Sequence, residues 1–283
     1  MLYMTALVLA VATVNQIVHT VPAEANVPVL DAPDGAVLGA SHVAHSAPLM
    51  SVAALAELAA NDPSRFAELA RESYEKNVRE YSCVFLKQER IGKKLSPLQE
   101  IEVLYRDQPL SVFMKWRRNP DQCRRVLYVA GRHVGKKGKQ LALVEPNGAI
   151  VRLFVKKIKI AIDGSRSKKA SRRTIDQFGF KSTLKLLADY NRLAEKRGVL
   201  KMSYEGEGTI DGRPTFVVVR HLPYTGPDCD YPDARMVIHF DQEWLLPVAV
   251  FSWADVDEKK LLGSYVMTKV RLNPGFSDSD FEF

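Results

Sequence analysis

Apolar and polar residues alternate twice between Leu98 and Trp116, with a short polar break in the middle. A β-strand places successive side chains on opposite faces, so the alternation predicts two half-buried strands, each with one apolar face. These apolar faces consist of Ile101, Val103, Tyr105, Leu110, Val112, Met114 and Trp116. The break, Asp107-Gln108-Pro109, is a turn signal. We therefore predict an antiparallel hairpin with one apolar side, and its function depends on what that side covers.

Similar patterns predict strands along much of the remaining chain. Besides the hairpin, the candidate strands are residues 81–91, 124–130, 140–144, 149–162, 200–210, 214–221, 235–240, 247–253 and 263–272. Their connections are mostly short and rich in Gly, Pro, Asn and Lys, which favours antiparallel neighbours over parallel crossovers.

Helical spacing interrupts the strand pattern at two main places. One helix is expected to begin at Pro63, with Asp62 as its N-cap. Another is predicted over residues 174–196, where Thr174 and Gln177 fit a capping box. The predicted fold class is α+β and mostly antiparallel β. We expect about ten strands in a large curved sheet or unclosed barrel, with the helices packed on its concave side.

The amino-terminal residues have the features of an export signal. Residues 6–14 form an apolar run, and Ala23-Glu24-Ala25 has the small-x-small form of a processing site, so residues 1–25 are predicted to be a signal peptide. The first five residues contain no Lys or Arg, which leaves a mis-assigned start or an ordinary buried helix as alternatives. Residues 26–50 are predicted to be a flexible leader and residues 51–283 a single domain. With a signal peptide, the protein is expected to be periplasmic or extracellular.

Composition indicates a basic globular protein with a real core. Apolar residues make up 46% of the chain, and the net charge is +7. Cys83, Cys123 and Cys229 are too few and too scattered for a disulfide scaffold. At most one bridge can form, and its connectivity is open; Cys83 with Cys123 is a candidate pair in an exported protein because both lie at the edges of predicted neighbouring strands.

A basic tract precedes the second predicted helix. Between Arg152 and Arg173 there are nine positive charges against one negative charge at Asp163. We expect the tract to dock on anionic surfaces such as lipid headgroups. Its proposed docking residues are Lys156, Lys157, Lys159, Arg166, Lys168, Lys169, Arg172 and Arg173. A solvated loop and an acidic polymer site are the alternatives, whereas a nucleic-acid partner is not expected because no aromatic residue follows Phe154 in the tract and no nucleic-acid motif frames it.

Aromatic residues and methionine are frequent on the predicted strands. Large adaptable apolar side chains suit a lipid-sized pocket, and they suit a thick core equally well. The candidate residues for a ligand cavity are Phe85, Val103, Tyr105, Val112, Met114, Trp116, Phe216, Phe251 and Trp253.

The sequence contains no recognised catalytic motif. There is no G-x-S-x-G, no H-E-x-x-H and no phosphate-binding loop, so we do not expect an enzyme. His221 and His239 could meet across a sheet, but no third ligand is indicated, and no metal or other cofactor is expected.

The segment YSCVFLKQERIGKKLSPLQEIEVLYRDQPLSVFMKW, followed by Leu127-Tyr128-Val129, resembles a bacterial family catalogued as domain of unknown function 1571. The later segment RRTIDQFGFKSTLKLL resembles the helix entry of the same family. More distantly, the order of elements is similar to the LolA-like fold of periplasmic lipoprotein carriers and of the regulator RseB. Gln88-Glu89, Gln108-Pro109 and Trp116 stand at the corresponding places. This resemblance implies an unclosed barrel over an apolar cavity that holds acyl chains or a hydrophobic peptide.

Two functions follow as expectations. The first is an exported, non-enzymatic binding protein whose apolar cavity takes a lipid, a lipidated protein or another hydrophobic ligand. The second is a protein-interaction or envelope-stress sensor module with a filled core and a basic docking loop. The two differ in whether the concave face of the sheet keeps an open cavity.

Overall fold

The computed structural model describes residues 50–148 and 156–283. The predicted signal peptide and all but the last residue of the predicted leader lie outside the described residues, so both stay predictions. In the part of the chain that is described, no helix is both long enough and apolar enough to cross a membrane.

The described residues form one antiparallel sheet of twelve strands. The strands are β1 (Glu80–Ile91), β2 (Lys94–Leu95), β3 (Gln99–Asp107), β4 (Leu110–Arg118), β5 (Cys123–Val129), β6 (Leu141–Pro146), β7 (Ile158–Ala161), β8 (Lys201–Ile210), β9 (Arg213–His221), β10 (Arg235–Asp241), β11 (Pro247–Trp253) and β12 (Leu261–Leu272). Their order is β7-β6-β5-β4-β3-β1-β12-β11-β10-β9-β8, and β2 pairs only with β1. β7 and β8 are end strands, so the sheet is unclosed and the predicted fold class is confirmed.

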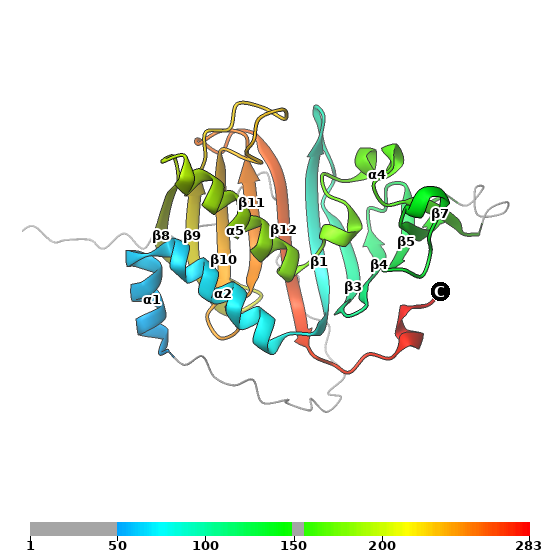
Figure 1. Cartoon of the computed structure of the whole chain (residues 1–283), viewed down its shortest axis with the longest axis horizontal. Helices are drawn as coiled ribbons and strands as arrows, with labels where there is room; N and C mark the ends of the chain where they lie inside the picture. The colour runs from blue at the N-terminus through cyan, green and yellow to red at the C-terminus, as the bar shows by residue number, and fades with distance from the viewer. Residues whose placement is uncertain (1–49, 149–155) are drawn as a thin grey trace, which may run out of the picture.

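The helices pack on one face of this sheet. In the described residues the α-helices are α1 (Val52–Asn61), α2 (Pro63–Asn77), α4 (Ser165–Ala170) and α5 (Phe180–Lys196). Figure 1 shows α2 and α5 crossing the half of the sheet formed by β8–β12, whereas α4 lies beside β4–β7. As predicted, α2 begins at Pro63, and the side chain of Asp62 caps it by accepting a 2.8 Å hydrogen bond from Arg65 N.

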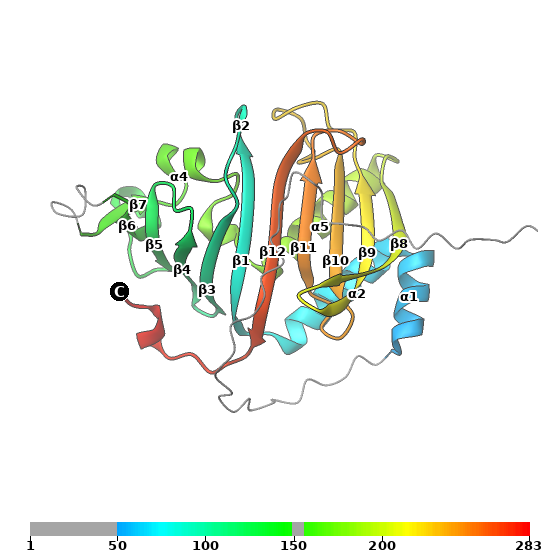
Figure 2. The same ribbon diagram turned by 180° about the vertical axis from the view of Figure 1, so that it is seen from behind.

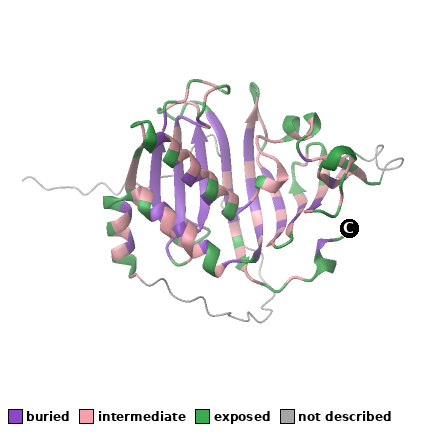
Figure 3. Ribbon diagram, viewed as in Figure 1, coloured by how far each residue is buried: buried purple, intermediate pink, exposed green. Residues whose placement is uncertain are grey.

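Aromatic side chains join the two helices to the sheet. Phe66 of α2 packs edge-on against Phe216 and Phe240, with ring centroids 5.5 and 5.2 Å apart. Phe180 at the start of α5 lies 4.7 Å from the Tyr81 ring. Figure 3 shows that β9, β10 and β11 beneath these helices are buried almost continuously, whereas burial alternates along β3.

The opposite face of the β3–β6 half is covered by residues near the C-terminus. Phe281, at the end of the short helix η3 (Asp278–Phe281), packs with Leu127 and Val129, and Phe276 and Phe283 join this cluster. Figure 2 shows the segment at the β3–β5 end of the molecule. The apolar residues on both faces of the hairpin therefore have cover.

Two details of the predicted elements are corrected. The described residues form twelve strands rather than about ten, because the two-residue β2 is too short to give an alternation. Of the predicted strand 149–162, residues 149–155 lie outside the described residues and stay a prediction, and the described part contains the short β7.

The predicted helix 174–196 is also broken. A one-turn helix, η2 (Ile175–Gln177), is followed by Phe178 and Gly179 before α5 starts, and Thr174 makes no capping hydrogen bond. Gly179 has a φ of +103°, a backbone conformation that side chains disfavour and that ends helical geometry.

Candidate functional site

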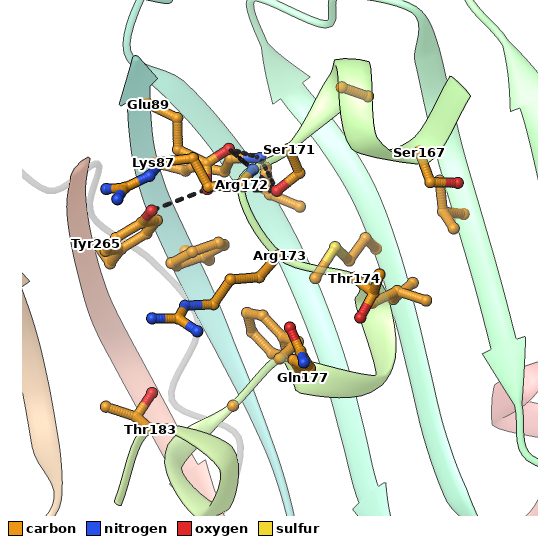
Figure 4. A pocket seen from close by; sticks show the side chains of 18 of the residues that line it. Lys87, Glu89, Ser167, Ser171, Arg172, Arg173, Thr174, Gln177, Thr183 and Tyr265 are labelled. Atoms are coloured by element: carbon orange, nitrogen blue, oxygen red, sulfur yellow. Dashed lines mark hydrogen bonds and ion pairs between the residues drawn. The ribbon is translucent and has the colours of Figure 1, made fainter. Parts of the chain in front are cut away.

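A cavity of about 440 Å³ lies between the sheet and residues 165–190. Its cover consists of α4, one face of α5 and residues 171–179, which we call the strap. Figure 4 shows the strap running above β1 and its neighbours, with polar side chains directed into the cavity. The cavity reaches solvent at its exposed lining residues, which are Gln122, Arg166, Ala170 and Gln177.

The hairpin's apolar side covers both core and cavity. Tyr105 stacks on Tyr81 with ring centroids 4.7 Å apart, and the strap's Gly179 lies against both rings. Farther along the same face, Ile101 and its cross-strand partner Trp116 line the cavity. One end of this face therefore packs as core, and the other end is left as cavity wall.

The wall formed by β3–β7 is apolar. Among the described residues, these strands contribute no charged side chain to the cavity. Their contribution consists of Ile101, Met114, Trp116, Cys123, Val126, Ala142, Val144, Pro146, Ile158 and Ile160. An apolar wall with a few polar groups elsewhere is the usual composition of a small-molecule site.

Glu89 joins the strap to the sheet on the other side of the cavity. Its side chain, 4% exposed, lies 2.9 Å from Lys87 Nζ and accepts a 2.9 Å hydrogen bond from Tyr265. It also accepts hydrogen bonds from Ser171 Oγ at 3.0 Å and from Arg172 N at 3.3 Å. Figure 4 shows these contacts converging where the strap passes over β1. The start of the strap is therefore fixed by a buried carboxylate.

The environment of Glu89 keeps it ionised. Burial alone raises the pKa of a carboxyl, but here the charge of Lys87 and hydrogen bonds from Lys87, Tyr265 and Ser171 together outweigh it. The pKa of Glu89 therefore lies below its usual value. For Tyr265, burial raises the pKa well above its usual value, and the neighbouring Glu89 charge adds to the shift, so the hydroxyl stays protonated and donates.

A second buried ion pair lies in the wall beyond the strap. Arg220 on β9 and Asp233 before β10 are both buried, with Arg220 Nη2 3.3 Å from Asp233 Oδ1. Arg220 Nη1 donates to Asn191 Oδ1 at 3.3 Å. Burial raises the pKa of Asp233, and the charge and hydrogen bond of Arg220, with smaller effects from the charges of Arg172 and Arg173, offset only part of that increase.

Two arginines of the strap face the cavity without a carboxylate partner. Arg172 donates from Nη2 to Pro232 O at 3.1 Å and from Nη1 to Ser252 Oγ at 3.4 Å. Figure 4 shows Arg173 reaching from the strap into the cavity. Within the described residues, no carboxylate oxygen lies within 4.0 Å of either guanidinium.

The structure places only three of the nine candidate cavity residues in the cavity lining. Phe85, Met114 and Trp116 line the cavity. The other six, Val103, Tyr105, Val112, Phe216, Phe251 and Trp253, are buried in the main core and lie outside the cavity lining.

The reason differs between the strands. Phe216 is covered by Phe66 of α2. Val250 and Ser252 of β11 line the cavity, so Phe251 and Trp253, which alternate with them, point to the opposite face of the sheet.

The proposed docking residues of the basic tract also fall into two groups in the structure. Arg166, Arg172 and Arg173 line the cavity, whereas Lys156, Lys157, Lys159, Lys168 and Lys169 are exposed and lie outside its lining. Lys157 donates to the backbone carbonyl of Phe283 and lies 5.3 Å from the centre of its ring. Docking on anionic surfaces by the exposed lysines stays a prediction.

The candidate disulfide between Cys83 and Cys123 is wrong, because all three cysteines are free. Cys83 lies on β1 and Cys123 on β5, three strand spacings apart in the sheet order. At about 4.8 Å a spacing this is roughly 14 Å, far beyond a disulfide's reach. Burial raises the pKa of both thiols, that of Cys123 to about 12. In the described residues, no group of three His, Cys, Asp or Glu is arranged to hold a metal ion.

Several site residues were not among the sequence candidates. They include Lys87, Glu89, Arg220, Asp233, Ile158 and Ile160. The sequence does contain a signal for Lys87 and Glu89. The alternation along β1 places both on the inward face, after the buried Cys83 and Phe85. A charge pair on an otherwise buried strand face indicates a buried polar contact.

Comparisons with known proteins give the family and distant structural likenesses. Lipoprotein LppX from Mycobacterium tuberculosis is 12% identical, covering 77% of this chain and 99% of that chain, with a TM-score of 0.41. The MucA/MucB complex from Pseudomonas aeruginosa matches at 13% identity over 77% of this chain, with a TM-score of 0.42, and the match spans 60% of that chain. A LolA superfamily protein from Nitrosomonas europaea is 9% identical, over 77% of this chain and 97% of that one, with a TM-score of 0.32. Each likeness concerns the fold alone.

No curated protein matches this sequence. A family model, in contrast, matches residues 78–283, from the start of the sheet to the C-terminal segment that covers the hairpin's outer face. The predicted resemblance to this family is confirmed. The chain belongs to the family described as "Protein of unknown function (DUF1571)".

Proposed function

We propose that this protein binds an aliphatic ligand, a lipid or the acyl chain of a lipidated protein, in the cavity beneath the strap, without transforming it. The observation that carries the proposal is the cavity of about 440 Å³ with its apolar wall along β3–β7. This volume falls in the range of about 300–1,000 Å³ found for small-molecule sites.

The apolar wall can supply useful affinity. Each methylene removed from water contributes about 0.8 kcal/mol, so ten buried methylenes give about 8 kcal/mol before the cost of association. The side chains of Met114 and Trp116 offer adaptable, large apolar contacts at this wall. A filled core, as in the alternative of an interaction module, fits less well with this open volume.

Export and docking complete the proposal. The apolar run and processing site within residues 1–25 support export to the periplasm or beyond. The exposed lysines of the basic tract would hold the protein near anionic headgroups, with each contributing about 1 kcal/mol at such a surface. The partners of this function are an aliphatic ligand and an anionic membrane surface.

The test is extraction of the purified full-length protein with organic solvent, followed by mass spectrometry of the extract. We expect a lipid at about one equivalent per chain. The variant Ala142→Trp fills the apolar wall and should lose this lipid, whereas Ala60→Trp, the same change at an exposed site on α1, should keep it. A wild-type protein that yields no lipid and takes up no added 1-hexadecanol or palmitate would overturn the proposal.

A further inference from the structure

The charges in the cavity wall are unevenly placed. Seven charged residues line it, five of them cationic and two acidic: Lys87, Glu89, Arg166, Arg172, Arg173, Arg220 and Asp233. They lie on β1, α4, the strap, β9 and the loop before β10, and none comes from β3–β7 in the described part of the chain. The cavity therefore has an apolar arm along β3–β7 and a cationic region beneath the strap.

Neither acid forms an ion pair with a guanidinium of the strap. Glu89 is paired with Lys87 at 2.9 Å, and Asp233 is paired with Arg220 at 3.3 Å. Arg172 and Arg173 are close enough for their charges to lower the pKa of Asp233, but less than Arg220 does. The Arg172 guanidinium makes hydrogen bonds only to a carbonyl and a hydroxyl, and the Arg173 guanidinium forms no ion pair or hydrogen bond among the described residues. The guanidinium groups of Arg172 and Arg173 therefore lie beside an apolar wall without a carboxylate partner and can pair with the anionic group of a ligand.

The strap segment that carries both arginines is anchored to the sheet and is not a free loop. Ser171 Oγ and Arg172 N both donate to the buried Glu89, and the Phe178 ring at the other end of the strap packs edge-on against Phe85 at 5.1 Å. Anchored at both ends, the strap presents Arg172 and Arg173 at a fixed place over the cavity. Pre-organised donors of this kind lose little freedom when a ligand binds.

We propose that the ligand is an anionic amphiphile, whose acyl chain lies along the β3–β7 wall and whose compact anionic head pairs with Arg173 and Arg172. The proposal rests on the proposed function and adds the ligand's chemical class. A guanidinium presents a planar fork of donors that matches a carboxylate or a phosphate in bidentate geometry. Both head chemistries fit the same two arginines, and the experiment below distinguishes them.

The experiment measures binding of palmitate, 1-hexadecanol and a palmitoyl lysophosphatidate to the delipidated full-length protein, by competition with a fluorescent fatty-acid probe or by calorimetry. Palmitate and hexadecanol share one chain length and differ in the charge of the head. We expect at least one of the two anions to bind at least tenfold more tightly than hexadecanol, with a preference that falls at high salt. The tighter of the two anions identifies the head as carboxylate or phosphate.

Variants test the role of the strap. Arg173→Gln should weaken binding of the preferred anion at least tenfold and change hexadecanol binding less than twofold, and Arg173→Lys should fall between wild type and Arg173→Gln. Arg192→Gln, the same change on the exposed face of α5, should bind like wild type. Hexadecanol binding as tightly as both anions, or an equal loss for all three ligands in Arg173→Gln, overturns this inference and leaves the proposed function standing. Failure of all three ligands to bind, together with the absence of lipid from the solvent extract, overturns both.

Discussion

Lys87 and Glu89 lie two residues apart on the inward face of β1, and Lys87 Nζ is 2.9 Å from Glu89 Oε2. Neither side chain has much contact with solvent, since they are 12% and 4% exposed. The same carboxylate receives hydrogen bonds from Ser171 of the strap and from Tyr265 of β12. A single buried acid thus links the strap that covers the cavity to the two central strands of the sheet.

Replacing Glu89 with Gln should destabilise the protein and change its response to acid. The variant leaves the largely buried Lys87 without a carboxylate, which we expect to lower the free energy of unfolding by about 3 kcal/mol at pH 7. Folding lowers the pKa of Glu89. The stabilisation from its ionised carboxylate is therefore fully present at pH values above the unfolded-state pKa of about 4.3, and it is lost as the pH falls through the folded-state pKa. Urea unfolding at a series of pH values measures both effects.

The comparison with wild type at each pH is the control, because another buried acid acts in the opposite direction. The pKa of Asp233 is raised, so its ionisation costs stability as the pH rises. Subtracting the unfolding free energy of the variant from that of the wild type at the same pH cancels the contribution of Asp233. A difference in unfolding free energy that does not shrink below about pH 4 would show that the Glu89 charge does not stabilise the fold.

Gly179 should tolerate a methyl group poorly. A Cβ there would overlap the hydroxyl oxygen of Tyr81 and lie 3.0 Å from Tyr105 Cε2, and the residue has a φ of +103°. We expect Gly179→Ala to lower the free energy of unfolding by about 3 kcal/mol. Gly198 is the matched control, since its φ is also positive, at +66°, but nothing lies within 4 Å of the added carbon. Gly198→Ala should cost about 1 kcal/mol, and equal losses in thermal unfolding would contradict the packing of the strap against Tyr81.

The Arg220–Asp233 pair should show strong coupling. Both side chains are almost fully buried, and the pKa of Asp233 is raised although Arg220 lies beside it, so the neutral Asp233→Asn should change the free energy of unfolding by less than about 1 kcal/mol. Arg220→Met instead leaves the buried Asp233 without its cation and should cost about 3–5 kcal/mol. The double variant should be less destabilised than the sum of the two single variants by about 1–3 kcal/mol in chemical unfolding. Additive losses would mean that the two groups do not stabilise each other.

Local patterns predicted the strands better than the connections between them. The alternation from Leu98 to Trp116 gave the β3–β4 hairpin and its inward face, because period-two patterning reports directly which side chains share a side. β2 has only two residues and carries no period. The break before α5 was missed because helical spacing continues through Phe178 and Gly179, and the need for glycine arises only from Tyr81, almost a hundred residues away.

The sequence predicted the apolar character of the candidate site, but only some of the residues that form it. Met114 and Trp116 line the cavity as expected of the hairpin's apolar end, yet Val112 on the same face does not. The difference depends on where the strap crosses, which no local pattern encodes. The inward position of Arg172 has the same origin, since its backbone N donates to Glu89, which lies 83 residues earlier in the sequence.

Met114 and Val112 offer the most direct check that the cavity is open. Both lie on the inward face of β4 and are 8% and 0% exposed, but only Met114 lines the cavity. We expect Met114→Lys to remain folded, because the lysine chain can extend through the cavity toward solvent, and to lose aliphatic ligands such as palmitate. Val112→Lys buries a charge in packed core and should cost more than about 4 kcal/mol or prevent folding. Circular dichroism melting with a fluorescent fatty-acid binding assay measures both outcomes. If both variants unfold alike, the space beside Met114 is packed as tightly as that around Val112.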